Sequence, residues 1–442
     1  MIGQPDSRGF DPAICALQAG GRWPGLTHGC PARFLLFEAH GIDSTRVRTL
    51  ATFIGHEKGN AVPHKNSVMH SVTQHIPWSD FERLVVQYGA DEGQRGFDSK
   101  RHLMAMLYAQ LGGASSLREI ELGLASHAAR LYHLGVRPAT RSTLADANRS
   151  RDSRLFTDLF RLLVGRLTRG QRRGLAETTY LLDATAVALP AGMARWARFS
   201  ATTCGAKVHV IYDAGAERPI YAAVTAANVN DITAAHAMPI EPGATYVFDL
   251  GYYDYGWWAT LDAAQCRIVT RFKKNTPLQV IEELPLPEAS VLLSDRIGFL
   301  PGRLGSGRRN PMADAVREIR LRTDSGKLLR ILSNDLDAPA QEIADLYKRR
   351  WVIELFFRWV KQTLRIRHFI GCSENAVRIQ IATALIAYLL LRLAQATQSA
   401  VASPLTFARL IRSNLMHLRT INALLRPPDP LPSTCTAQLM LL

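Results

Sequence analysis

Residues 180–189 read YLLDATAVAL, and two runs of the same kind follow, AKVHVIYD at 206–213 and PIYAAVTAA at 219–227. β-Branched, aliphatic and aromatic residues dominate these runs and turn-forming residues separate them, which is the pattern of consecutive β-strands. Asp183 lies in the middle of the first run, where an ionised carboxylate is costly unless it is paired or binds a cation. The first run therefore predicts both the start of a sheet and a candidate ligand.

Helix and strand patterns alternate after the third run. A helix is expected from Asp231 to Met238, and the strand TYVFD then ends at Asp249. The helix YGWWATLDAAQ and the strand CRIVTRF come next. Three strands, a crossover and further alternation predict a mixed α/β sheet. Asp249 is expected at the carboxyl edge of that sheet, where functional sites tend to form.

A helix expected after Pro339 contains the segment YKRRWVIELFFRWVK at 347–361. At about 100° per residue, four of its polar side chains fall within an arc of roughly 60°. They are Tyr347, Arg350, Glu354 and Lys361. Four apolar side chains are expected to point elsewhere and pack inward: Trp351, Val352, Leu355 and Trp359. An acid flanked by cations suits a metal ligand beside a polyanion, whereas a solvated face of mixed charge is the alternative.

Carboxylates from two strands and a later helix can converge on one pair of divalent cations. The predicted catalytic and metal-binding set is Asp183, Asp249 and Glu354. Hard oxygen ligands favour two Mg²⁺ ions, for which Mn²⁺ can substitute, and phosphoryl transfer needs such convergence. Arg350 and Lys361 would hold a phosphate backbone, and Tyr347 would donate to a phosphate or stack on a base. Taken singly, each acid can also be a strand-end cap or a buried ion-pair partner.

The charge of the chain points to an acidic partner. Its 442 residues include 53 Lys and Arg against 38 Asp and Glu, a formal charge of +15. Nucleic acid and a membrane surface both remain open on charge alone. The cations concentrate in 296–330 and 345–368. Further DNA-binding residues are predicted at Lys273, Lys274, Arg308, Arg309 and Arg349.

Several other functional classes find no support in the sequence. The six cysteines include no CxxC pair, so neither a zinc site nor a disulfide framework is indicated. No Walker loop, GxGxxG or HExxH motif occurs. His209 and His236 are candidate acid–base groups, although a structural histidine is the commoner case.

Two features bear on location. The N-terminal MIGQPDSRGFDP lacks the basic start and apolar core of a secretory signal, so a cytoplasmic, nucleoid-associated protein is expected. The longest apolar run, 381–391, is too short for a comfortable membrane span. It predicts a buried core helix, and no membrane partner is expected.

Helical patterns fill the N-terminal part of the chain. FERLVVQYG, KRHLMAMLYAQLGG and SLREIELGLASH read as amphipathic helices, and Thr143 with Asp146 is a candidate capping box for another. They predict a helical DNA-binding domain over 69–170, with a bundle that only supports the next domain as the alternative. Residues 1–68 are predicted to be a non-native or disordered extension ahead of a natural start at Met69.

The remaining boundaries follow from changes of pattern. The catalytic domain is predicted over 171–425. Within it, the irregular stretch 273–330, with its Pro and Gly residues and the alternating VREIRLRT, predicts a β insertion. The tail 426–442 is predicted to be unstructured.

The polar residues of the late helix resemble a known signature. The DDE transposases of the insertion-sequence-4 family carry Tyr, two residues, Arg, three residues, Glu, six residues and Lys. Here these positions are Tyr347, Arg350, Glu354 and Lys361. LLDAT around Asp183 and FDLGYYDY around Asp249 also look like that family. The resemblance extends from about Met69 to Leu425.

The resemblance implies an α/β fold, an RNase H-like mixed sheet flanked by helices, with a β-rich insertion and an N-terminal helical DNA-binding domain. It implies metal-dependent cleavage at the terminal inverted repeats of an insertion sequence, followed by attack of the 3′-hydroxyl ends on target DNA. A homodimer in the synaptic complex is implied as well. The chain lacks a tryptophan between Trp258 and Trp351, so a hairpin route would need Phe272 or Phe299 instead.

Two alternatives to an active transposase remain. One is a catalytically decayed DNA-binding relic or a repressor of transposition. The other is a metal-dependent nuclease unrelated to mobile elements, which the basic insertion and the Tyr-to-Lys signature disfavour.

Overall fold

The computed structural model describes most of the chain between residues 66 and 426. The described ranges are 66–168, 178–190, 195–197, 204–286, 291–304, 307–323, 326–364, 369–371 and 373–426. They belong to one structural unit. The predicted extension falls outside them up to residue 65, as does the predicted tail from residue 427.

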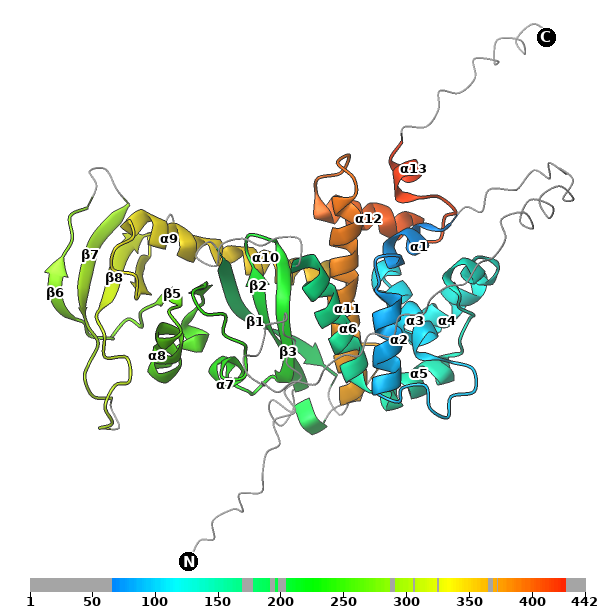
Figure 1. Cartoon of the computed structure of the whole chain (residues 1–442), viewed down its shortest axis with the longest axis horizontal. Helices are drawn as coiled ribbons and strands as arrows, with labels where there is room; N and C mark the ends of the chain where they lie inside the picture. The colour runs from blue at the N-terminus through cyan, green and yellow to red at the C-terminus, as the bar shows by residue number, and fades with distance from the viewer. Residues whose placement is uncertain are drawn as a thin grey trace, which may run out of the picture. The chain divides into compact units, whose positions relative to one another are not determined.

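Nine strands form one mixed sheet in the order β3-β2-β1-β4-β5-β9-β8-β7-β6 (Figure 1). Their bounds are β1 Thr179–Leu189, β2 Cys204–Asp213, β3 Arg218–Ala226, β4 Thr245–Val247, β5 Arg267–Arg271, β6 Gln279–Glu283, β7 Leu292–Phe299, β8 Val316–Arg322 and β9 Leu328–Ser333. β1, β2 and β3 are antiparallel neighbours, whereas β4 and β5 run parallel to β1. β5 pairs with β9 in antiparallel fashion, and β8, β7 and β6 continue that pattern. The predicted mixed α/β fold is confirmed.

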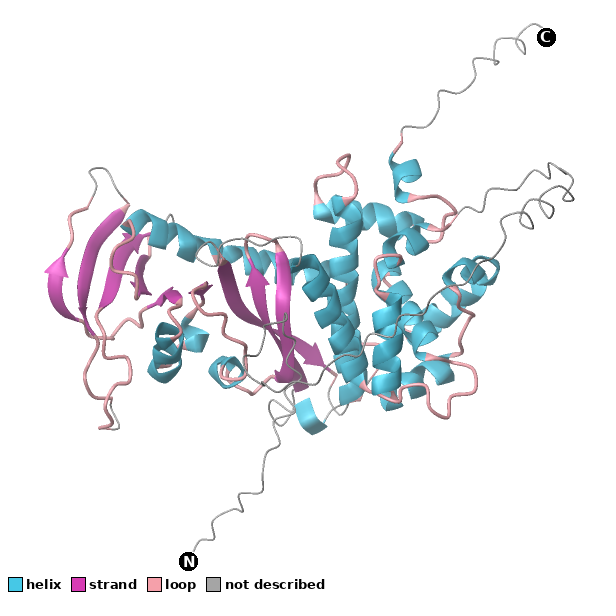
Figure 2. Ribbon diagram, in the orientation of Figure 1, coloured by secondary structure: helices cyan, strands magenta, loops and turns pink. Residues whose placement is uncertain are grey.

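Helices precede, interrupt and follow the strands (Figure 2). Before the sheet come α1 Val68–Thr73, α2 Trp78–Gln87, α3 Ser99–Gly112, α4 Leu117–Ser126, the 3₁₀ helix η1 Ala128–Leu134, α5 Arg141–Ser150 and α6 Ser153–Thr168. Between strands lie η3 Arg195–Ala197, α7 Asp231–Ala235, η4 Leu250–Tyr252 and α8 Tyr255–Ala263. After β9 come α9 Ala340–Arg349, α10 Trp351–Thr363, α11 Glu374–Ala396, α12 Pro404–Asn414 and α13 Ile421–Leu425.

Side-chain caps define several helix starts. The expected capping box at Thr143 is wrong, because α5 begins at Arg141 and Thr140 is its N-cap. Thr140 has the extended backbone that an N-cap needs, and its hydroxyl accepts the Thr143 amide at 3.3 Å. Thr143 is already inside the first turn, so its amide is a donor that needs a cap.

α11 is the central helix of the structure. It packs on α3, α5 and α6 on one side and on α10 and β3 on another. By length and composition α11 is the one helix in the described ranges that is apolar enough to cross a membrane, but 83% of its most apolar window is buried inside the protein. The apolar run 381–391 is buried throughout, which confirms the predicted core helix.

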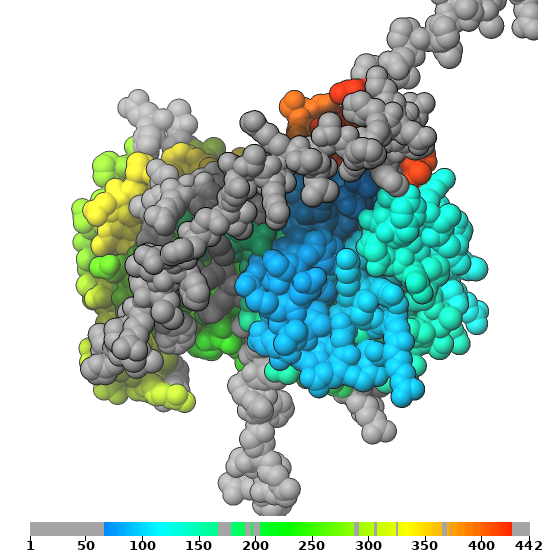
Figure 3. All heavy atoms as spheres, turned by 45° about the vertical axis from the view of Figure 1, so that its right-hand side comes forward, coloured from blue at the N-terminus to red at the C-terminus, as the bar shows by residue number. Residues whose placement is uncertain are grey.

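The two ends of the described chain meet. The amides of Val68 and Met69 donate to the carbonyls of His417 and Leu415 at 3.0 and 2.8 Å. In Figure 3 the blue N-terminal surface accordingly adjoins the orange and red C-terminal helices. Ser67 caps α1 and Val68 is fully buried, so the packed structure includes residues from the end of the predicted extension.

Candidate active site

The register of the parallel strands brings two of the candidate acids together. β1, β4 and β5 align Leu181 with Val247 and Val269. The chain stays extended beyond β4, because the Phe248 amide donates to the Val269 carbonyl at 3.1 Å. Asp183 and Asp249 each lie two residues beyond the last aligned pair, Leu181 and Val247, and the charge of Asp249 acts on Asp183. Neighbouring strands lie about 4.8 Å apart, so these carboxylates stand side by side at the end of β4.

The side chain of Asp183 is mostly buried, with 18% of it exposed. Burial raises the pKa of its carboxyl to about 6, opposed by a hydrogen bond from the Ala184 amide at 2.8 Å. The negative charges of Asp249 and Glu354 raise the pKa further, and Arg350 lowers it. Three carboxylates therefore share one electrostatic environment, as metal and catalytic sites do.

Arg350 lies at the junction of α9 and α10 and connects two of these acids. Its Nη1 is 3.5 Å from Oδ2 of Asp183, and its Nη2 forms an ion pair with Oε1 of Glu354. The guanidinium also lies 5.9 Å from the ring centroid of Tyr347. Tyr347 is only 9% exposed, and burial raises its pKa. Lys361 lies two turns beyond Glu354 and is half-buried.

The other predicted DNA-binding residues do not join this cluster. Arg349 is exposed and lines a cleft with Thr179, Thr245 and Arg267, which mark the opposite, amino ends of the parallel strands. Four more cations are exposed on the surface: Lys273, Lys274, Arg308 and Arg309. Lys273 places its Nζ 4.2 Å from the ring centroid of Tyr253.

The expected inward direction of two apolar side chains of α10 is wrong. Trp351 and Leu355 are 51% and 43% exposed, whereas Val352 and Trp359 are partly buried against the core. The side that faces the core carries Ile353, Phe356, Phe357 and Val360. This set includes two phenylalanines and buries more apolar area than the expected one, so it takes the core-facing side. The polar stripe then lies at the border between the buried and exposed faces.

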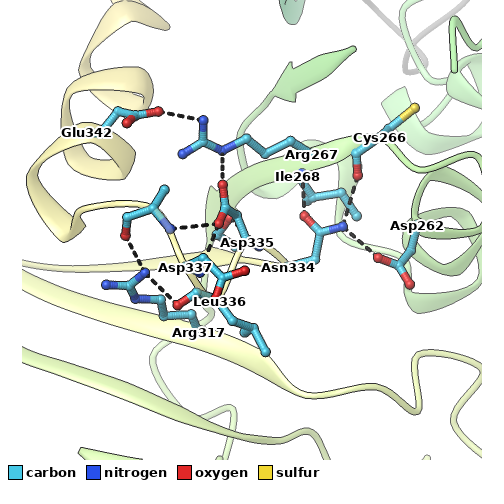
Figure 4. A network of polar contacts seen from close by, with 12 residues as sticks. Asp262, Cys266, Arg267, Ile268, Arg317, Asn334, Asp335, Leu336, Asp337 and Glu342 are labelled. Carbon is cyan, nitrogen blue, oxygen red and sulfur yellow. Dashed lines mark hydrogen bonds and ion pairs between the residues drawn. The ribbon is translucent and has the colours of Figure 1, made fainter. Parts of the chain in front are cut away.

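Polar contacts fix the point where α9 begins (Figure 4). Oδ1 of Asp335 accepts the amide of Ala338 at 2.9 Å, and Oδ2 pairs with Nε of Arg267 at 2.9 Å. Arg267 reaches Glu342 on α9 at 2.6 Å. Arg317 in β8 donates to the carbonyl of Ala338 at 2.5 Å. β5, β8 and β9 thereby set the direction of the helix that carries Tyr347 and leads into Arg350.

The donor set suits a hard divalent cation, because carboxylate oxygens are the ligands that Mg²⁺ and Mn²⁺ prefer. Asp183 and Asp249 fit as an adjacent pair. No three His, Cys, Asp or Glu side chains within the described ranges are arranged to hold one ion, and Glu354 is engaged by Arg350.

Sequence reasoning missed Arg271. Arg271 is the last residue of β5, two positions beyond Val269, which pairs with the last residue of β4. Arg271 is half-buried, and its charge opposes the rise that burial causes in the pKa of Tyr347. Its buried Nε has no hydrogen-bond partner among the described residues. A half-buried guanidinium with a buried nitrogen that lacks an acceptor suits an anionic ligand. Aligning TYVFD with CRIVTRF as parallel neighbours would have found it.

The two candidate histidines differ in environment. His209 is fully buried, shares a hydrogen bond of 2.9 Å with the hydroxyl of Thr225, and lies 3.7 Å from Asp231. Burial and then Lys207 lower its pKa to about 3, so the ring is neutral and structural. His236 is exposed at the end of α7.

Comparison with known proteins identifies the family. Residues 175–390 match the family described as Transposase DDE domain, and residues 64–137 match a domain of unknown function, DUF4372. The Sinorhizobium fredii protein y4zB, which is named as a transposase, is 39% identical over 290 residues, covering 66% of this chain and 81% of that protein. The chain belongs to the DDE transposases. This transposase is therefore an enzyme of DNA transposition that cuts and joins DNA, and its family implies divalent metal.

Further relatives carry names of insertion-sequence transposases. The protein named for the element IS5377 of Geobacillus stearothermophilus is 29% identical over 245 residues, 53% of this transposase and 62% of that protein. The protein named for IS4SA of Synechocystis is 44% identical over 66 residues, 15% and 20% of the two chains. These names confirm the predicted insertion-sequence resemblance. The solved piggyBac transposase synaptic complex with hairpin DNA matches with a TM-score of 0.46 and 10% identity, covering 84% of this chain and 88% of that one.

Proposed function

We propose that this transposase binds the terminal inverted repeats of an insertion sequence, cleaves at the ends, and joins the 3′-hydroxyl ends to target DNA. Asp183, Asp249 and Glu354 would be its catalytic acids. The observation that carries the proposal is the shared environment of these carboxylates, because burial and the other two acids raise the pKa of Asp183 to about 6. A protein that only binds DNA has no need of such a cluster.

We infer that the part of the sheet ordered β3-β2-β1-β4-β5 is an RNase H-like core. Its three antiparallel strands followed by two parallel ones support this assignment. The catalytic domain would then extend over 171–425, with a β insertion at 273–330 that supplies β6, β7 and β8. The helices before the sheet would form the DNA-binding domain, 69–170.

Two Mg²⁺ ions are the proposed cofactors, with Asp183 and Asp249 as the ligands that fit best and Glu354 as the third. When bound, such ions activate a water or 3′-hydroxyl for in-line attack and stabilise the leaving oxygen. The cations of the chain have a separate task. Arg350 and Arg271 would neutralise and orient the phosphate that reacts, and a homodimer would hold two DNA ends in the synaptic complex.

The test is cleavage of DNA that carries the element's ends, with Mg²⁺, by the full chain. Asp183→Ala, Asp249→Ala and Glu354→Ala should each lose roughly 1,000-fold in rate or more, since several kcal/mol of charge stabilisation disappear. Asp345→Ala removes an exposed acid from α9 and should cleave normally. Triad variants as active as wild type would refute the assignment. A wild-type protein that binds the ends without cutting them would favour the relic or repressor.

A further inference from the structure

A fourth acid stands beside the carboxylate cluster. Asp231 begins α7, and its Oδ1 lies 2.9 Å from Nζ of Lys207 in β2. The same ammonium donates to the carbonyl of Val229 at 2.9 Å. Lys207 thus joins β2 to the segment that leads into α7. Neither Lys207 nor Asp231 has a part in the chemistry proposed above.

Gly251 connects this ion pair to Asp249. The Gly251 amide donates to Oδ1 of Asp249 at 2.8 Å and so orients that carboxylate. A Cβ on Gly251 would lie 2.7 Å from Oδ2 of Asp231 and 3.1 Å from Oδ1 of Asp249. The two acids therefore contact the same backbone position, and only a residue without a side chain leaves room for both.

Tyr252 follows Gly251 and is the last residue of η4. Its side chain is fully buried, and its carbonyl accepts the indole N–H of Trp258 at 3.0 Å. Burial raises the pKa of Tyr252, and the charges of Asp231, Asp183 and Asp249 raise it further. The hydroxyl therefore stays protonated near the acids, and within the described ranges it has no hydrogen-bond partner.

Asp231 would be a costly neighbour for Asp249 without a counter-charge, because like charges at short range repel. His209 is neutral and lies 3.7 Å from Asp231, too far for a hydrogen bond. The positive charge of Lys207 therefore offsets the repulsion between the two acids and allows Asp231 to lie next to the Gly251 turn.

We propose that Asp231, held in place by Lys207, is a positioning residue that stabilises the Gly251 turn and thereby fixes the carboxylate of Asp249. This inference rests on the proposed function, since it takes Asp249 to be a metal ligand. Asp231 itself acts through the turn and touches neither the metal nor the DNA. Outer contacts of this kind orient metal ligands in many proteins.

The test measures Mn²⁺ binding to the purified full chain. The electron paramagnetic resonance signal of the free ion reports how much Mn²⁺ remains unbound. Gly251→Ala and Asp231→Asn should weaken Mn²⁺ binding by roughly 10-fold or more while the melting temperature stays unchanged. The matched control is Gly256→Ala, whose Cβ would meet only Asp254 within 4 Å, at 3.2 Å. It should bind Mn²⁺ like wild type.

Lys207→Met distinguishes two effects of Lys207 on Mn²⁺ affinity, the support of Asp231 and the repulsion of the metal ion by the lysine charge. Removing a cation near carboxylates strengthens binding of a divalent ion if charge alone matters, whereas loss of the support for Asp231 weakens it. We expect weaker binding, with Lys207→Arg close to wild type. Tighter binding by Lys207→Met, or wild-type binding by Asp231→Asn, would overturn the inference. Should Gly251→Ala fail to fold, the isosteric Asp231→Asn decides.

Failure of the proposed function has a different signature. If Asp183→Ala and Asp249→Ala bind Mn²⁺ as wild type does, these acids are not the metal ligands and the proposed function is at fault. If those two variants lose binding and Asp231→Asn does not, only the role of Asp231 is wrong.

Discussion

The guanidinium of Arg350, at the junction of α9 and α10, lies 3.5 Å from the carboxylate of Asp183 on β1, while it also pairs with Glu354 on α10. One cation of the chain thus engages two of the three acids proposed to hold metal. A guanidinium and a divalent ion compete for the same carboxylate oxygens. A DNA phosphate is a strong alternative acceptor for Arg350. DNA binding is therefore expected to release the acids for the metal.

Removal of this cation should strengthen metal binding in the absence of DNA. We expect Arg350→Ala to bind Mn²⁺ roughly 5-fold more tightly than wild type, as loss of one competing ion pair of about 1 kcal/mol implies. Isothermal titration without DNA measures this. The neighbouring Arg349→Ala, at the opposite ends of the strands, should leave the affinity unchanged. Unchanged or weaker binding by Arg350→Ala would contradict the competition.

Arg271 should contribute to DNA binding through its charge. We expect Arg271→Ala to weaken binding of end DNA and to lower the slope of log K against log salt by about 1, since one fewer phosphate contact releases fewer counterions. Titrations at several salt concentrations give this slope. Arg271→Lys keeps the charge and should keep the slope, while losing affinity through its single-point contact. A wild-type slope in Arg271→Ala would remove Arg271 from the interface.

Asp183 should make the metal-free protein less stable at neutral than at acidic pH. Its folded-state pKa of about 6 is above the ordinary value of 3.8, so its contribution to stability is fully present below pH 3.8 and is lost as the pH rises through 6. Asp183→Asn should therefore be more stable than wild type by roughly 3 kcal/mol at pH 7.5, with little difference at pH 4. Melting curves with chelator test this. An equal difference at both pH values would count against a titrating Asp183.

The ion pair between Arg317 and Asp295 should stabilise the outer strands and the start of α9. Their side chains are 4% and 2% exposed, and Nη2 lies 2.6 Å from Oδ2. Arg317→Met alone should cost about 3–5 kcal/mol, because it leaves a buried carboxylate unpaired. The double variant with Asp295→Leu should recover much of this loss. Denaturant unfolding measures both, and a double variant less stable than Arg317→Met would show that the pair itself is strongly stabilising.

Much of the framework follows from local pattern. The strand with Asp183, the strand that precedes Asp249 and the helix after Pro339 all occur where apolar runs and turn residues indicate them. Glu354 approaches Asp183 because a sheet and the helix packed on it bring distant segments together. The spacing of Tyr347, Arg350 and Glu354 carried this information, although the structure divides the expected single helix at Arg350 into α9 and α10.

What sequence reasoning missed depends on contacts between distant segments. Arg271 approaches Tyr347 only through the pairing of β5 with its neighbours, which a single strand does not encode. The Lys207–Asp231 pair joins residues 24 positions apart across a turn of the fold. The exposure of Trp351 depends on which side of α10 packs against the core. That choice depends on the surfaces of β1 and α11, on which α10 packs.

α11 also limits how this transposase can be divided. The helix packs against the N-terminal helices and also against β3. The N-terminal helices and the sheet therefore share a single hydrophobic core. A recombinant fragment that starts at residue 178 would leave one flank of α11 bare and should aggregate. Exchanging the N-terminal helices between relatives would likewise require the matching α11, so these helices and the domain with the sheet are expected to be inherited together.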